Sequence, residues 1–249
     1  MRSAGAIAGV ARGVVLGWAL GGACAWAQPP AAAGDPYAQP RRALLAELRR
    51  QARDGAGEAR IDPAALELLA RVPRHAYVPA AQRAHAYANR PLAIGYGQTI
   101  SQPYIVALMT SLAQPKPGQK ILEVGTGSGY QAAVLAESGA RVYTIEIVAP
   151  LAAQARQRLR RYRNVETRMG DGYYGWQEAA PFDAIVVTAA ASSIPPPLLA
   201  QLKPGGRMVI PVGSSFHAQT LMRVSKDAAG RVRTRQVLPV RFVPLTGGR

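Results

Sequence analysis

The feature that most constrains the fold is a glycine-rich turn between two short apolar runs. Residues 120–124 (KILEV) have the pattern of a buried strand, and residues 125–129 (GTGSG) follow them directly. Residues 129–138 have the pattern of an apolar helix, and a second strand pattern at residues 141–145 leads into Glu146. Glycines at such a turn let the backbone reverse sharply and bring a ligand close to the main chain. The segment therefore predicts a strand, turn, helix and strand unit that binds a ligand at its turn.

The alternation of strand and helix patterns continues toward the end of the chain. Strands are expected at 165–169, 182–187 and 207–211, helices at 150–162 and 196–202, and two further strands at 217–225 and 231–240 around a turn at 227–230. Continuous apolar strands separated by helices favour a parallel sheet covered on both faces. The last two strands have a hairpin pattern, so the sheet should end in antiparallel strands. The fold class is therefore α/β, a doubly wound, mostly parallel sheet of the Rossmann-like type.

The first half of the chain is expected to be a helical extension of this sheet. Leucines at helical spacing predict a helix over residues 41–53, and Asp62-Pro63 is a strong helix start because Asp caps and Pro fits the first turn. Residues 92–103 (LAIGYGQTISQP) are rich in glycine and small polar residues, which predicts a structured loop. A short apolar helix should follow at residues 104–113.

The N-terminus has the layout of a secretory signal peptide. Residues 1–27 combine an early Arg2 with an apolar run and end in Ala-Trp-Ala, a cleavage pattern. Residues 28–40 are rich in alanine and proline and are interpreted as a linker. We expect a single domain over residues 41–249, with helices and a substrate loop in 41–118 and the cofactor-binding sheet in 119–249. Export to the periplasm or beyond follows, with a mis-assigned start and a cytoplasmic location as the alternative.

The charge and the composition exclude several classes of site. The chain has 30 Lys and Arg against 14 Asp and Glu, a net charge of +16, which would suit a nucleic acid or reflect a bias toward arginine. The arginines are not interleaved with stacking aromatics, so no specific nucleic-acid partner is expected. The single cysteine, Cys24, lies within the predicted signal, and the three histidines match no ligand spacing. We therefore expect no metal.

The residues around the glycine turn favour one cofactor. The third glycine of a dinucleotide fingerprint is displaced, and no Walker lysine is present. Glu146 ends the second strand about twenty residues after the first glycine of the turn, the sequence spacing at which a carboxylate reaches ribose hydroxyls. Glu123 can attract a positive methionine end, and Asp171 can accept from an adenine amino group. These features predict S-adenosylmethionine. The expected cofactor-binding residues are Glu123, Gly125, Thr126, Gly127, Ser128, Gly129, Glu146, Ile147, Asp171 and Gly172.

Several segments resemble the protein-L-isoaspartate O-methyltransferase family, from about residue 61 to residue 246. The segments GQTISQPY (residues 97–104), VPRHAYVP (residues 72–79), EVGTGSGYQAA, GDGYYGW, FDAIVVTAA and VRFVPLT carry the similarity. GQTISQPY is the most specific, because other methyltransferases share only the glycine turn. The resemblance implies a class I methyltransferase fold. It also implies methyl transfer to isoaspartyl and D-aspartyl residues of damaged proteins. The extension through Pro40 departs from the family's core.

The resemblance also implies the substrate-binding residues. Thr99, Ile100 and Ser101 would hold the isoaspartyl carboxylate, with Ser101 as the catalytic residue, and Gln102, Tyr104 and Gln219 would lie nearby. A carboxylate is already ionised at neutral pH, so the reaction needs alignment of its atoms and no general base. Ser101 could alternatively, or additionally, cap the helix that begins near Pro103.

Two alternatives remain open from the sequence. An RNA methyltransferase would share the fold, although residues 187–190 (VTAA) lack the aromatic residue that usually stacks on a base. An exported relative could instead bind the cofactor without catalysis, since S-adenosylmethionine is a cytosolic metabolite. Whichever function holds, we expect a monomer without stable membrane insertion once the signal is removed.

Overall fold

The computed structural model describes residues 35–214 and 218–248. The predicted signal peptide and most of the predicted linker lie outside the described residues.

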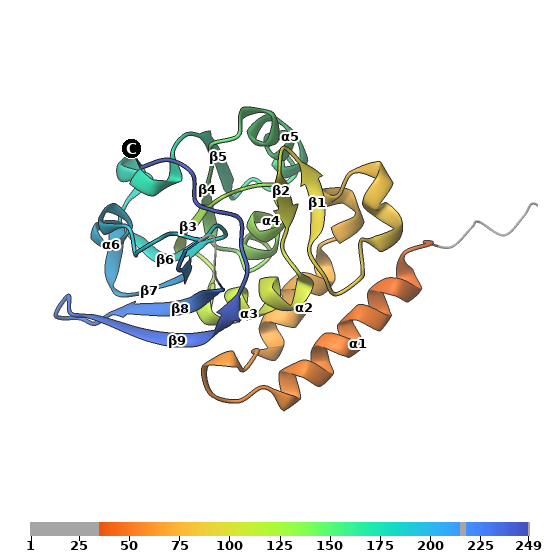
Figure 1. The fold of residues 1–249 in the computed structure, drawn as a ribbon, viewed down its shortest axis with the longest axis horizontal. Coiled ribbons are helices and arrows are strands. Elements are labelled where there is room, and N and C mark those ends of the chain that lie inside the picture. The colour runs from red at the N-terminus through yellow and green to blue at the C-terminus, as the bar shows by residue number, and fades with distance from the viewer. Residues whose placement is uncertain (1–34, 215–217, 249) are drawn as a thin grey trace, which may run out of the picture. The chain divides into compact units, whose positions relative to one another are not determined.

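Seven strands form one sheet in the order β5-β4-β3-β6-β7-β8-β9 (Figure 1). The strands are β3 (Lys120–Val124), β4 (Arg141–Glu146), β5 (Val165–Met169), β6 (Phe182–Val187), β7 (Leu202–Val212), β8 (Gln219–Lys226) and β9 (Val232–Val240). The strands from β3 to β7 pair in parallel, whereas β8 pairs antiparallel with both of its neighbours. The predicted fold class and the antiparallel end of the sheet are confirmed.

The chain reverses its direction of winding at β3. It builds β4 and β5 on one side of β3 and then places β6 on the other side. The carboxyl ends of β3 and β6 therefore flank the topological switch point, where open α/β sheets bind ligands. The glycine turn follows β3 at this point.

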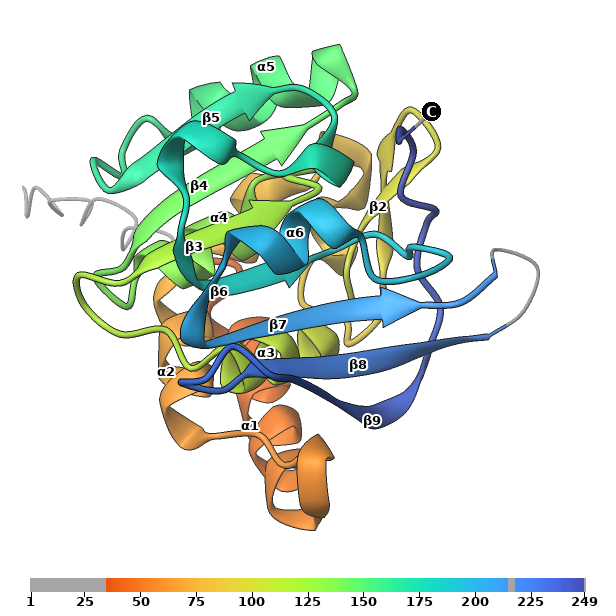
Figure 2. The ribbon, with the colours of Figure 1, turned by 90° about the vertical axis from the view of Figure 1, so that its left-hand side faces the viewer.

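Helices cover both faces of the sheet (Figure 2). The helices are α1 (Ala38–Asp54), α2 (Pro63–Arg71), α3 (Pro103–Ala113), α4 (Tyr130–Ala136), α5 (Ala149–Leu159) and α6 (Pro196–Gln201). One face of the sheet, which includes Ile121 and Val186, packs against α3, α4 and α5, and α2 and α1 extend this core, because α2 packs on α3 and α4 and α1 packs on α2. The opposite face, which includes Leu122 and Val187, packs against α6. Successive strand residues thus alternate between two apolar cores, which explains the continuous apolar runs.

The helical extension follows the local signals in its sequence. Asp62 caps α2 by accepting a hydrogen bond from the Ala64 amide at 2.9 Å, and Pro63 takes the first helical position. Nearly every residue of α3 is buried. Its two buried polar side chains are hydrogen-bonded: Thr110 accepts from the Gln131 side chain and Ser111 accepts from the Asp62 amide. The expectation of a short apolar helix here is confirmed.

Three details differ from the sequence predictions. Residues 92–100, expected as a loop, form a hairpin of β1 (Leu92–Gly95) and β2 (Gln98–Ile100), because Gly95, Tyr96 and Gly97 all take positive φ and reverse the chain. Helix α1 begins at Ala38, inside the predicted linker. The N-cap of α3 is Gln102, whose side chain makes no capping bond, so a capping role for Ser101 was wrong.

One edge of the sheet carries exposed arginines. Strand β9 forms one edge, and its Arg233 and Arg235 are exposed to solvent. Arg235 also pairs with Glu58, which in addition binds Arg223 of β8. Within residues 35–214 and 218–248, no helix has the length and apolar character that crossing a membrane requires.

Candidate active site

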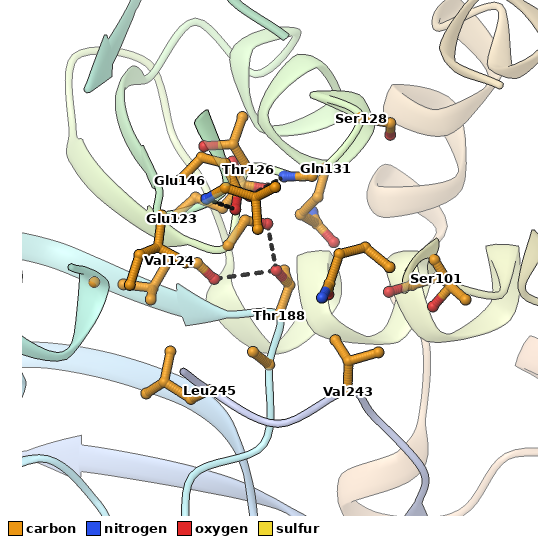
Figure 3. A pocket seen from close by; sticks show the side chains of 18 of the residues that line it. Ser101, Glu123, Val124, Thr126, Ser128, Gln131, Glu146, Thr188, Val243 and Leu245 are labelled. Atoms are coloured by element: carbon orange, nitrogen blue, oxygen red, sulfur yellow. Dashed lines mark hydrogen bonds between the residues drawn. The ribbon is translucent and has the colours of Figure 1, made fainter. Parts of the chain in front are cut away.

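A cavity opens at the carboxyl ends of β3, β4 and β6, beside the switch point. Its walls come from the glycine loop, the ends of β3 and β4, the β2 hairpin strand and a C-terminal segment, residues 243–246. Figure 3 shows side chains from these separate elements around the cavity, with Val243 and Leu245 entering below Thr188. Segments distant in the sequence are therefore brought to one pocket.

The glycine loop passes very close to the end of β6. Gly125 has a φ of 93°, and a Cβ built on it would lie 2.6 Å from the Thr188 hydroxyl oxygen. That hydroxyl lies 2.6 Å from the Gly125 carbonyl oxygen and 3.0 Å from that of Val124, so it donates its single proton to this pair. Only glycine fits at position 125, both for its conformation and for its space.

Glu146, at the end of β4, holds the glycine loop in place by hydrogen bonds from backbone amides. Its carboxylate accepts hydrogen bonds from the Gly127 amide at 2.7 Å and from the Val148 amide at 2.9 Å. The side chain is largely buried and lines the cavity. A carboxylate has about four acceptor positions, so two remain for a ligand such as a ribose diol.

Glu123 is fully buried at the base of the cavity. Its Oε2 accepts from the Thr144 hydroxyl at 2.5 Å, and that hydroxyl lies 2.6 Å from the Thr126 hydroxyl. Its Oε1 meets no hydrogen-bond partner. Burial, which the nearby Glu146 charge reinforces, raises the pKa of Glu123 from its ordinary value to about 8. A cation in the cavity would stabilise the ionised form of this carboxyl group.

A second cavity of about 830 Å³ lies against the first one. The two share four lining residues, Thr99, Ser101, Thr188 and Val243. Gln102 and Tyr104 line only the second cavity, whose other walls are the end of α1 and residues 238–243. The predicted substrate segment therefore stands between two separate spaces.

Three predicted site residues lie outside both cavities. Gly129 begins α4 behind the loop, and Asp171 accepts hydrogen bonds from the Tyr173 amide at 2.9 Å and the Gly248 amide at 2.7 Å. Gln219 is buried and accepts from the Phe242 amide at 2.8 Å, so it braces the wall of the second cavity. Every other predicted residue lines at least one cavity.

Sequence reasoning missed Gln131, Thr188 and the wall formed by residues 243–246. Gln131 lines the cavity, donates to Thr110 at 2.9 Å and leaves its Oε1 without a partner. The C-terminal segment reaches the cavity through backbone bonds between Ala190 and both Val243 and Leu245. The sequence position of Thr188 at the end of a strand was a signal for a site residue, whereas the C-terminal contact had none.

No group of three or more His, Cys, Asp or Glu side chains in residues 35–214 and 218–248 could hold a metal ion.

A ligand cavity at the switch point of a parallel sheet that ends in antiparallel strands is the arrangement of class I methyltransferases, and this chain has that fold. The sequence model described as protein-L-isoaspartate(D-aspartate) O-methyltransferase (PCMT) matches residues 42–249. The chain belongs to this family of S-adenosylmethionine-dependent enzymes, which confirms the resemblance.

Named relatives cover most of the chain. Protein-L-isoaspartate O-methyltransferase 2 of Syntrophobacter fumaroxidans is 59% identical over 240 residues, 94% of this chain and 95% of the relative. Its namesake in a Polaromonas species is 62% identical over 207 residues, 82% of this chain and 98% of the relative. These relatives favour a protein carboxyl methyltransferase over the RNA methyltransferase and non-catalytic alternatives.

Solved structures agree with this assignment. A protein-L-isoaspartate O-methyltransferase superposes with a TM-score of 0.74 at 26% identity, covering 83% of this chain and 66% of its own. A Plasmodium falciparum protein-L-isoaspartate O-methyltransferase in complex with S-adenosyl-L-homocysteine has a TM-score of 0.71 at 25% identity, covering 83% of this chain and 98% of its own.

Proposed function

We propose that this chain transfers the methyl group of S-adenosylmethionine to the free carboxylate of L-isoaspartyl and D-aspartyl residues in damaged proteins. A carboxylate oxygen attacks the methyl carbon, the bond from carbon to sulfur breaks, and its electron pair stays on sulfur. The products are a methyl ester and S-adenosylhomocysteine. The ester is then poised to close to a succinimide, which begins repair. No general base is needed, because the attacking carboxylate is ionised at neutral pH.

Two unpartnered acceptors support S-adenosylmethionine as the cofactor. Glu123 Oε1 and Gln131 Oε1 are both buried, both belong to residues that line the first cavity, and neither meets a donor. Buried acceptors without partners are costly, and the α-ammonium group of the cofactor offers three donors. Glu146 would accept from the ribose hydroxyls, with Ile147 and Gly172 beside the base. The cofactor-binding roles of Gly125, Thr126, Gly127, Ser128, Gly129 and Asp171 belong to this same proposal.

The cofactor cavity is contracted in this structure. Its free volume is about 70 Å³, whereas small-molecule sites typically offer about 300–1,000 Å³. We expect binding to move one wall outward. The candidates are the β2 strand and the C-terminal segment, because the remaining walls belong to the sheet, the glycine loop and the buried helices α3 and α4. Near its end, the C-terminal segment is held by a hydrogen bond from the Gly248 amide to the Asp171 carboxylate.

We propose that the second cavity receives the damaged peptide. Its lining combines apolar and polar side chains, and Asp54 and Arg241 are the charged residues among those that the structure describes. The Ser101 hydroxyl would donate to one oxygen of the isoaspartyl carboxylate, while Thr99 and Ile100 form the wall beside it. Gln102 and Tyr104 would contact the flanking residues, and Gln219 would hold the wall through Phe242. Since Ser101 lines both cavities, a carboxylate held there faces the cofactor side.

The shared wall at Ser101 and Thr188 is the observation that carries this proposal, because the two reactants must meet through one opening. The test is methyl transfer from radiolabelled S-adenosylmethionine to an isoaspartyl peptide and to its normal aspartyl twin. We expect label only in the isoaspartyl peptide. Equal labelling of both peptides, or labelling of neither, would contradict the proposal.

An RNA substrate is separately testable. Filter binding of RNA should be weak, and it should lose affinity with salt regardless of sequence, as expected from net charge alone. Sequence-specific RNA binding that persists at physiological salt would support the RNA methyltransferase alternative instead.

We also propose that residues 1–27 are a cleaved export signal, that the segment from Gln28 to the start of α1 at Ala38 is a linker, and that the chain from α1 onward works as a single-domain monomer. The basis is the cleavage pattern in the sequence. N-terminal sequencing of the protein from its native host should find Gln28 first, whereas a chain that retains Arg2 in the cytoplasm contradicts export. Light scattering of the purified protein measures the oligomeric state.

A further inference from the structure

Arg74 is a fully buried cation without an acidic partner. It lies on the short turn Arg74–Tyr77 after α2, with no exposed surface. No carboxylate in the described part of the chain forms an ion pair with it. Arginine is almost never fully buried unless it is paired, because removing its charge from water is unfavourable. Such an exception calls for a physical reason.

The guanidinium group of Arg74 ties three segments together. Its Nε donates to the Ala86 carbonyl at 3.0 Å, and its Nη2 donates to the Ser101 carbonyl at 2.8 Å. Its carbon Cζ lies 5.0 Å from the centre of the Tyr130 ring, in cation–π contact. Ser101 and Tyr130 both line the cofactor cavity, whereas Arg74 does not. Arg74 therefore stands directly behind two walls of the site.

The positive charge of Arg74 persists at neutral pH. Burial lowers its pKa to about 10, while the hydroxyl groups of Tyr130 and Tyr87 oppose the decrease. Its Nη1 meets no acceptor, so its charge is only partly balanced by the two carbonyl groups and the ring. The acidic residues that line the first cavity, Glu123 and Glu146, come from the ends of β3 and β4 and lie across the cavity from Ser101 (Figure 3). The wall around Ser101 is thus backed by a cation.

We propose that Arg74 is a positioning residue for the substrate carboxylate, an inference that rests on the proposed function. It fixes the backbone of Ser101, so that the hydroxyl points from a rigid loop, and its charge favours an anion bound at that loop. A buried charge acts over several ångströms because the low polarity around it screens it weakly. Arg74 does not touch the reacting atoms.

Substitution of Arg74 should separate its charge from its hydrogen bonds. Arg74→Lys keeps the charge, Arg74→Gln keeps one donor without the charge, and Arg74→Met keeps only the volume. We expect Arg74→Met and Arg74→Gln to raise KM for an isoaspartyl peptide at least tenfold, and Arg74→Lys to restore most of this loss. The affinity for S-adenosylhomocysteine should stay within about threefold in all variants. Arg71→Met, an exposed arginine on the same segment, is the matched control and should leave KM unchanged.

A ratio of two inhibition constants makes the test insensitive to partial unfolding of a variant. Inhibition of methyl transfer is measured with a peptide that carries the isoaspartyl carboxylate and with its carboxamide analogue. The ratio of the two inhibition constants does not depend on the fraction of the protein that is active. The wild type should prefer the carboxylate, and both Arg74→Gln and Arg74→Met should lose most of that preference. An unchanged preference in these variants, or an equal loss in Arg74→Lys, overturns the inference. If the wild type itself fails to methylate the isoaspartyl peptide, the proposed function fails instead.

Discussion

The Glu146 carboxylate accepts a hydrogen bond of 2.7 Å from the Gly127 amide. One acidic side chain at the end of β4 thereby fixes the middle of the glycine loop, which belongs to the connection after β3. The same side chain lines the cofactor cavity, so it both shapes the loop and faces the ligand.

Replacement of Glu146 should weaken cofactor binding. In Glu146→Ala the Gly127 and Val148 amides lose their acceptor and the ribose loses its partner. We expect the Kd for S-adenosylhomocysteine to rise at least tenfold, about 1.4 kcal/mol, by calorimetry. Glu166→Ala removes an exposed glutamate from β5 and is the matched control. An unchanged Kd in Glu146→Ala would remove this residue from the site.

Replacement of Ser101 should lower catalysis without weakening cofactor binding. Ser101→Ala removes the proposed donor to the substrate carboxylate, and a lost hydrogen bond to a charged group corresponds to about 1.5–3 kcal/mol, roughly tenfold to 100-fold in kcat/KM. Steady-state kinetics with an isoaspartyl peptide measure this loss. Ser193→Ala, at an exposed position outside both cavities, should have no effect. A parallel loss of cofactor affinity would refute the assigned role.

The bond between Gly248 and Asp171 should slow cofactor exchange. A Cβ built on Gly247, which has a φ of 117°, would overlap the Asp171 carboxylate. Gly247→Ala should therefore free the C-terminal segment and raise the dissociation rate of S-adenosylhomocysteine about fivefold or more in stopped-flow measurements. Gly230→Ala is the control, because Gly230 also has a positive φ of 79° but no atom lies near its missing Cβ. Equal rates in both variants would contradict a role for the segment.

The buried Glu123 should make stability depend on pH. Burial raises its pKa from 4.5 to about 8, so the folded protein holds a proton that the unfolded chain releases between these pH values. Stability from this group is complete below about pH 4.5 and falls as the pH rises to about 8. Glu123→Gln stays neutral, so its stability relative to the wild type should increase by more than about 1 kcal/mol between pH 5 and pH 8. Urea unfolding of the cofactor-free protein measures this difference. A pH-independent difference would show that Glu123 is ionised throughout.

The sequence predicted the features that depend on neighbours along the chain. The strand β3, the glycine loop and Glu146 lie within one continuous segment, and alternate burial on two faces gives each strand its apolar run. The order of helices and strands after residue 120 followed from the same local patterns. The family resemblance added Ser101, which no local pattern identifies as a site residue.

Other features depend on contacts between distant segments. Arg74 has the sequence context of any surface arginine, and only the fold places it against Ala86 and Ser101. The C-terminal segment becomes a wall through its pairing with Ala190, more than fifty positions earlier in the chain. The hairpin of β1 and β2 could not be predicted, because a glycine-rich hairpin turn and a glycine-rich loop have the same composition. Only the pairing of the two strands distinguishes them.

The exposed arginines of β9 have a consequence for how this protein interacts with its protein substrates. An exposed edge strand presents unpaired backbone groups, and another polypeptide chain can pair with them as an added strand. Cationic side chains along that edge oppose such unwanted pairing, as they do in other sheet proteins. We therefore expect the protein to resist co-aggregation with its substrates, because charged side chains line the edge strand that could otherwise template fibril growth.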